Sequence, residues 1–128
     1  VHCEYSIRAL EAGKHVVTDK PMCLSVEECD RMIAAQQKSG SLLSVFHNRR
    51  WDGDFLTAQQ LMNDGALGDV RWLELAWQNF GPPGGWRGQA EKGGGRLLDL
   101  GAHMLDQLLL LFPERVTSVY ARIGHDFD

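Results

Sequence analysis

Residues 11–21 have the sequence EAGKHVVTDKP, and this stretch decides the class of fold. Residues 15–18, which include the β-branched Val16, Val17 and Thr18, predict a short strand buried in a parallel sheet. Gly13 suits the left-handed position after a helix, so residues 3–12 are predicted to form a helix. Pro21 blocks strand pairing and keeps Lys20 extended. The stretch therefore predicts a helix followed by a parallel strand that ends at Lys20.

The next residues continue this alternation. Ser25 followed by Glu28 three residues later is a capping-box pattern and predicts the start of a helix. That helix is expected to end at Gly40, and residues 42–46 are predicted to form another short apolar strand. Residues 1–47 thus have the helix–strand–helix–strand pattern of a parallel α/β sheet.

After residue 47 the pattern changes, which places a domain boundary near residues 46–50. A helix capped by Asp52 and ending near Gly65 is predicted first. The later predicted elements are a strand at 69–80 with Leu73, Leu75 and Trp77 on one face, a loop at 81–85, a glycine break at 93–95, a helix at 96–112 and a strand at 116–123. Residues 48–128 therefore predict part of an α+β domain with an open sheet.

Composition excludes several classes of function. The fractions of 44% hydrophobic and 23% charged residues are typical of a globular protein. A formal net charge of −4 argues against a nucleic-acid surface, which requires a basic face. The longest apolar run, residues 108–112, is far shorter than the roughly 20 residues of a membrane span.

The chain has three cysteines and no C-x-x-C pair, which argues against a disulfide framework or a zinc knuckle. We expect reduced thiols in a cytoplasmic protein and no metal site. The first residue is Val1 rather than Met, so we expect an internal piece of a longer protein.

Lys20 is the first candidate for chemistry. It follows a predicted parallel strand, and ligands of open α/β sheets bind outside the carboxyl ends of such strands. Its ammonium group could hydrogen-bond a substrate hydroxyl and stabilise an alkoxide. The alternative is a solvated surface lysine before a turn proline.

Asp99, His103 and Asp106 form the second candidate. In a continuous α-helix these spacings would place the three side chains on one face. An imidazole could accept the proton of an alcohol while hydride leaves its carbon, and a carboxylate could orient the ring. The alternative is a buried structural histidine on an amphipathic helix.

Loop residues supply further candidates. Trp86 and Arg87 offer an aromatic plane and a fork of donors for a polyhydroxylated ligand, or they anchor the loop to the domain. Residues 48–51 could line a cleft or form a polar linker. The run Gly93–Gly95 lets the backbone approach a ligand, but no G-x-G-x-x-G or P-loop motif is present in the chain.

Two segments together resemble the glucose–fructose oxidoreductase / inositol dehydrogenase (Gfo/Idh/MocA) family. Residues 11–21 are similar to its A-G-K-H-V-x-x-E-K-P segment, and residues 94–106 are similar to its G-G-x-x-x-D-x-G-x-H-x-x-D segment. Residues 48–57 and 65–70 also match, and the sequences of residues 47–52 and 99–103 most resemble the scyllo-inositol dehydrogenase-like branch. The family usually has Glu, near the cofactor, at the position where this chain has Asp19, whose side chain is one methylene shorter.

The resemblance implies a Rossmann remnant at residues 1–47, part of a substrate domain at 48–128, and a cleft between them. Lys20, Asp99 and His103 correspond to the family's catalytic residues, and a cis peptide is expected between Lys20 and Pro21. The implied cofactor is NAD or NADP, with Asp19, Lys20, Pro21 and Arg49 near it. The implied substrate is a small sugar or polyol, bound by Trp86, Arg87, Asp99 and His103.

The sequence thus predicts an oxidoreductase that moves hydride between NAD(P) and a secondary alcohol of a sugar or cyclitol such as an inositol. We expect a homo-oligomer that associates through the open sheet. The alternatives are a non-catalytic ligand-binding or regulatory subunit on the same scaffold, or a fragment without activity.

Overall fold

The computed structural model describes residues 2–78, 81, 84–89, 92–122 and 124. The chain divides into two compact units, Val1–Asn48 and Arg49–Asp128.

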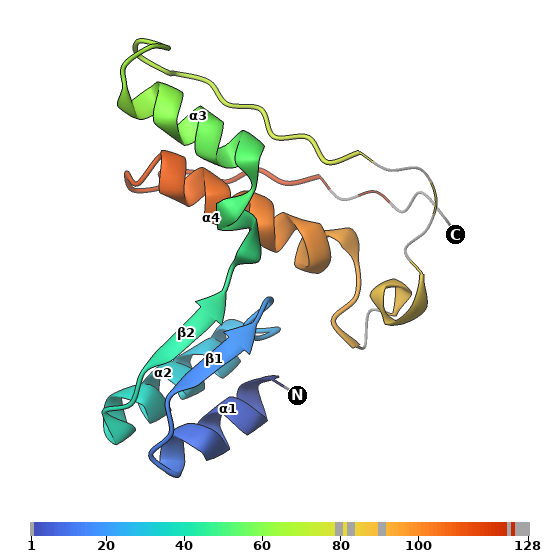
Figure 1. Cartoon of the computed structure of the whole chain (residues 1–128). Coiled ribbons are helices and arrows are strands. Elements are labelled where there is room, and N and C mark those ends of the chain that lie inside the picture. Colours follow the sequence, from blue (N-terminus) through green and yellow to red (C-terminus); the bar gives the residue numbers. More distant parts are fainter. Residues whose placement is uncertain (1, 79–80, 82–83, 90–91, 123, 125–128) are drawn as a thin grey trace. The chain divides into compact units, whose positions relative to one another are not determined.

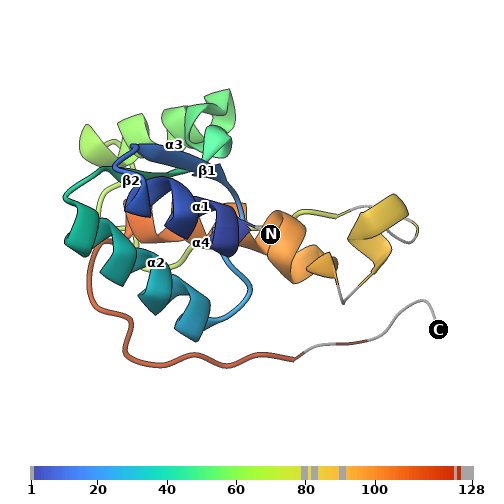
Figure 2. The same cartoon turned by 90° about the horizontal axis from the view of Figure 1, so that it is seen from below.

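The first unit consists of α1 (His2–Glu11), β1 (Val16–Asp19), α2 (Val26–Ser39) and β2 (Leu43–Phe46). The two strands are parallel, with Val16 opposite Leu43 and Asp19 opposite Phe46. Helix α2 is the crossover between them, as a parallel pair requires. Helix α1 packs against both α2 and β1. Figures 1 and 2 show both helices on the same side of the strand pair.

The core of this unit lies between the two helices and one face of the strands. Leu10 and Met32 are fully buried there, and Thr18 is the buried residue of β1. Val17, on the other face, is 73% exposed. The prediction that this strand is buried is therefore wrong for the described residues, because the helices cover only one face of the pair.

Local signals set the ends of α2. The backbone N–H of Glu28 donates to Ser25 Oγ at 3.2 Å, as the capping pattern predicted. The Glu28 carboxylate accepts from the N–H of Leu24 at 2.9 Å, rather than from that of Ser25. Gly40 ends the helix at φ +66°, where a side chain would be strained.

The second unit contains α3 (Gly53–Asn63), the 3₁₀ turn η2 (Gly85–Gly88), the π-helical turn η4 (Leu97–Gly101) and α4 (Ala102–Leu111). The 3₁₀ turn η1 (Asn48–Trp51) spans the boundary between the units. The predicted helix 52–65 is present as α3, but the Asp52 side chain makes no capping bond. Instead it binds Arg49 at 3.1 Å, so its carboxylate is engaged outside the helix end.

The single α-helix predicted at 96–112 is wrong in its first part, because the chain passes through η4 before α4 begins. The predicted strands are also wrong within their described parts, residues 69–78 and 116–122, which form no strand. Residues 79, 80 and 123 of those predictions, and residues 82 and 83 of the predicted loop, lie outside the described residues. Alternation of apolar and polar residues indicates only that a segment has two different faces, whereas a strand also needs a hydrogen-bonded neighbour.

Candidate active site

The segment after β1 places Lys20 at the carboxyl end of a parallel strand. Asp19 is the last residue of β1, and its carboxylate accepts the backbone N–H of Lys20 at 2.8 Å. The Lys20–Pro21 peptide is cis, as the family resemblance implied. The carbonyl of Pro21 lies 2.9 Å from Nδ1 of His2 on α1. These contacts fix the backbone on both sides of Lys20, which is half-buried.

His103 is a buried residue of α4, with 4% of its surface exposed. Asp99 precedes it by four residues and lies in the π-helical turn. The prediction that Asp99 and His103 share one face assumed a continuous α-helix. Because η4 is π-helical, the four-residue spacing does not by itself place the two side chains on one face. Single π-turns inside helices are frequent at functional sites. The structure therefore keeps both candidates on neighbouring turns, but on different kinds of helix.

Asp99 is held by Arg87. The guanidinium Nε donates to Asp99 Oδ2 at 3.0 Å, and the Asp99 side chain is 17% exposed. The guanidinium also lies over the ring of Trp86, 4.8 Å from its centroid. The structure thus brings together Trp86, Arg87 and Asp99, three predicted site residues. A charge-assisted hydrogen bond of this kind fixes the orientation of the carboxylate.

The glycine run holds the loop that carries Arg87. The N–H of Gly95 donates to the carbonyl of Arg87 at 2.7 Å, and that of Gly94 donates to Gln89 at 3.0 Å. A Cβ on Gly94 would lie 2.5 Å from the Arg87 carbonyl oxygen. The backbones of η2 and the glycine run can therefore approach this closely only because residue 94 is glycine.

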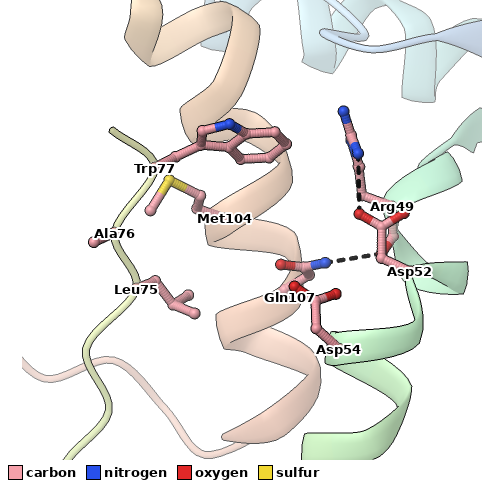
Figure 3. A pocket seen from close by; sticks show the side chains of 8 residues that line it. All are labelled: Arg49, Asp52, Asp54, Leu75, Ala76, Trp77, Met104 and Gln107. Atoms are coloured by element: carbon pink, nitrogen blue, oxygen red, sulfur yellow. Dashed lines mark hydrogen bonds and ion pairs between the residues drawn. The ribbon is translucent and has the colours of Figure 1, made fainter. Parts of the chain in front are cut away.

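Arg49 lines a cavity of about 310 Å³ in the second unit. Its guanidinium binds Asp52 at 3.1 Å and lies 4.6 Å from the centroid of the Trp77 ring. Its backbone carbonyl accepts the Gln107 side chain at 2.8 Å. Figure 3 shows these groups; the residues that line the cavity are Arg49, Asp52, Asp54, Leu75, Ala76, Trp77, Met104 and Gln107.

Sequence reasoning did not assign several of these residues to the site. Trp77 could have been considered, because it lies on the same face of the predicted strand 69–80 as Leu73 and Leu75. Asp106 was predicted to share a stripe with His103, and its carboxylate forms an ion pair with Arg50. Nothing in the sequence pattern pairs residue 50 with residue 106, because fifty-six positions separate them.

Comparison with known proteins agrees with this fold. Residues 1–47 match "Oxidoreductase family, NAD-binding Rossmann fold", and residues 55–128 match "GFO/IDH/MocA C-terminal domain". A Rossmann remnant followed by this second domain is the domain order of one family of dinucleotide-binding proteins. The chain belongs to the GFO/IDH/MocA family.

Individual relatives share both units. The chain is 41% identical to scyllo-inositol 2-dehydrogenase (NADP(+)) IolW of Bacillus subtilis, over 92% of this chain and 34% of that protein. A solved NAD-binding protein from Listeria innocua has a TM-score of 0.73 at 38% identity, covering 86% of this chain and 33% of that one. For aldose-aldose oxidoreductase from Caulobacter crescentus the TM-score is 0.70 at 36% identity, covering 88% and 34%. The chain spans about a third of the length of the relatives it matches.

The family match confirms the expectation of NAD or NADP as cofactor. The first unit fits a dinucleotide in one respect that the structure shows: its parallel strands end side by side at Asp19 and Phe46. Ligands of open α/β sheets bind at this edge. Among the described residues, none of the helices has the length and apolar character needed to cross a membrane.

Proposed function

We propose that the intact protein transfers hydride between a nicotinamide dinucleotide and a secondary alcohol of a sugar or cyclitol. The observation that carries the proposal is the buried His103, which follows a carboxylate fixed by Arg87. The activities named for two relatives, an inositol dehydrogenase and an aldose–aldose oxidoreductase, support this class of substrate.

In the direction of oxidation, the C–H bond of the alcohol breaks and its electron pair leaves with the hydrogen. A bound nicotinamide would supply the acceptor for that hydride. His103 accepts the hydroxyl proton as general base, and a carbonyl forms at the oxidised carbon. A buried imidazole suits this role because it can hold the proton away from bulk water.

Lys20 supplies the positive charge that stabilises the oxygen as its proton leaves. Asp99 binds a substrate hydroxyl or orients His103, and Arg87 holds it in place for either role. Trp86 and Arg87 border the substrate on the Asp99 side. Asp19, Lys20, Pro21 and Arg49 are assigned to the cofactor.

The test is reduction of NAD or NADP by the intact protein with a panel of inositols and aldoses. The expected result is turnover with at least one panel member, measured as the absorbance of the reduced cofactor. Cofactor binding by fluorescence without reduction by any panel member would contradict the proposal and favour a ligand-binding or regulatory subunit.

Location and assembly are further proposals. The three cysteines are free, which suits a reducing compartment, so we place the protein in the cytoplasm. We propose a homo-oligomer that associates through the open sheet of the intact second domain. Light scattering of the intact protein measures its mass, and a monomeric mass would contradict the proposed homo-oligomer.

A further inference from the structure

We propose that Arg50, Asp106 and Gln107 are positioning residues that fix the helix of His103 to the start of the second unit. This inference rests on the proposed function, because it concerns where His103 is held. The three residues and the backbone carbonyl of Arg49 are called the junction clamp below.

The junction clamp joins two consecutive residues of η1 to two consecutive residues of α4. Arg50 donates to both carboxylate oxygens of Asp106, through Nε at 2.8 Å and Nη2 at 2.5 Å. Gln107 Nε2 donates to the carbonyl of Arg49 at 2.8 Å. A bidentate pair fixes direction as well as distance, and the second bond prevents rotation about the first. Together they determine which face of α4 is turned toward η1.

The burial of the Asp106 carboxylate separates this ion pair from ordinary surface pairs. The Asp106 side chain is 13% exposed and that of Arg50 is 44% exposed. The hydrogen bond from Arg50 to Asp106 is the main cause that raises the pKa of the Arg50 guanidinium. The Arg71–Asp69 pair in the same unit is 82% and 87% exposed, and such pairs contribute little.

The position of His103 gives the junction clamp its functional meaning. Asp106 follows His103 by three residues within α4, so their side chains are neighbours on the helix surface. Asp99 precedes His103 by four residues and is bound by Arg87. In the sequence, the buried histidine thus lies between two carboxylates, each bound by an arginine from a different 3₁₀ turn. This arrangement sets both the position and the rotation of the turn that carries the imidazole.

The other end of the junction clamp lies where the chain passes from one unit to the next. The unit boundary falls between Asn48 and Arg49, inside η1. Residues 48–54 belong to neither matched family segment. Arg49 is itself bound to Asp52 and lies over Trp77, as Figure 3 shows in part. The first residues of the second unit are therefore anchored to α4 and to the start of α3.

The test uses the intact protein with the variants Arg50→Gln, Asp106→Asn and the double substitution. Small displacements of a catalytic group cost up to about 10²-fold in rate, so we expect kcat to fall by roughly 10- to 100-fold. The Kd for the dinucleotide should stay within about twofold. The double variant should be no slower than the slower single variant, because both act through one contact. Arg50→Lys should recover part of the loss, since it keeps the charge without the fork.

Arg71→Gln is the matched control, because it removes an arginine from an exposed pair in the same unit. It should turn over like the wild type. A kcat for Arg50→Gln equal to that of Arg71→Gln would overturn the proposal. So would a loss that affects cofactor binding and the unfolding midpoint as much as kcat, or additive effects in the double variant. His103→Ala is measured beside them: if it retains turnover, the proposed function itself is wrong.

Discussion

At the scale of single residues, two arginines determine how the acidic groups of the candidate site are held. Arg87 binds Asp99 and Arg50 binds Asp106, and both carboxylates flank the buried His103 in sequence. The sequence predicted Asp99 and His103 as candidates, because their types and spacing suit proton transfer. It assigned Arg87 to the substrate, which stays a prediction, and the structure shows in addition that the Arg87 guanidinium binds Asp99.

Gly94→Ala should destabilise the loop that carries Arg87. The added Cβ would lie 2.5 Å from the Arg87 oxygen and 2.7 Å from those of Gln89 and Trp86, all of them backbone atoms. The backbone must shift, so we expect a loss of about 1–3 kcal/mol in the free energy of unfolding, together with slower turnover. Urea unfolding and steady-state kinetics measure the two effects.

Gly84→Ala is the matched control for this substitution. Its Cβ would meet nothing within 4 Å, and its φ is −85°, which any residue adopts. We expect wild-type stability and turnover. Equal stability of the Gly94→Ala and Gly84→Ala variants would show that the close backbone approach has no energetic importance.

Cys23 should react slowly with alkylating reagents. The pKa of the Cys23 thiol is raised, mainly by burial and next by the neighbouring Cys29. A raised pKa favours the neutral thiol, and the thiolate is the reactive form, so the pH midpoint of alkylation shifts upward on folding. Iodoacetamide labelling of Cys23 across pH 7–10, followed by mass spectrometry, measures this midpoint. The urea-unfolded chain is the control, and a folded midpoint at or below the unfolded one would contradict the assignment.

At the scale of elements, the sequence was most informative where a helix end has its own side-chain signal. The start of α2 at Ser25 and its end at Gly40 were both predicted, because a capping hydroxyl and a left-handed glycine act locally. The π-helical turn η4 was missed, because nothing in a leucine-rich pattern distinguishes it from α-helix. The strands at 69–80 and 116–123 were predicted from alternation, which does not report whether a neighbouring strand is present.

Ser25→Ala should destabilise the first unit. It removes the acceptor for the N–H of Glu28, and loss of such a cap costs about 1 kcal/mol. Thermal unfolding followed by circular dichroism measures the effect on the intact protein. Ser25→Asp keeps an oxygen acceptor at the same position and should remain close to the wild type. A Ser25→Ala variant as stable as Ser25→Asp would mean that the cap does not stabilise α2.

At the scale of the whole molecule, the chain consists of two units whose described parts match the two domains of one oxidoreductase family. The family could be predicted from two motifs about eighty residues apart, residues 11–21 and 94–106. Their order and spacing are more specific than either motif alone. The choice between NAD and NADP could not be predicted, because the chain contains no G-x-G-x-x-G turn and no residue known to contact the ribose.

The central claim is that one residue from the first unit and one from the second serve the same hydride transfer. In the proposed function, Lys20 supplies the charge that stabilises the oxygen and His103 accepts the proton. Lys20→Ala should slow turnover, whereas Lys14→Ala should not, because Lys14 is an exposed lysine of the same segment. This pair of variants controls for the loss of a positive charge as such.

The most direct measurement is the kcat of His103→Ala in the intact protein with a polyol substrate, with the dinucleotide Kd measured separately by fluorescence. General acid–base groups are worth about 10²–10⁴-fold in rate. We expect kcat to fall by that factor while the Kd changes little. Near wild-type turnover would contradict the account and leave His103 as a buried structural residue of α4.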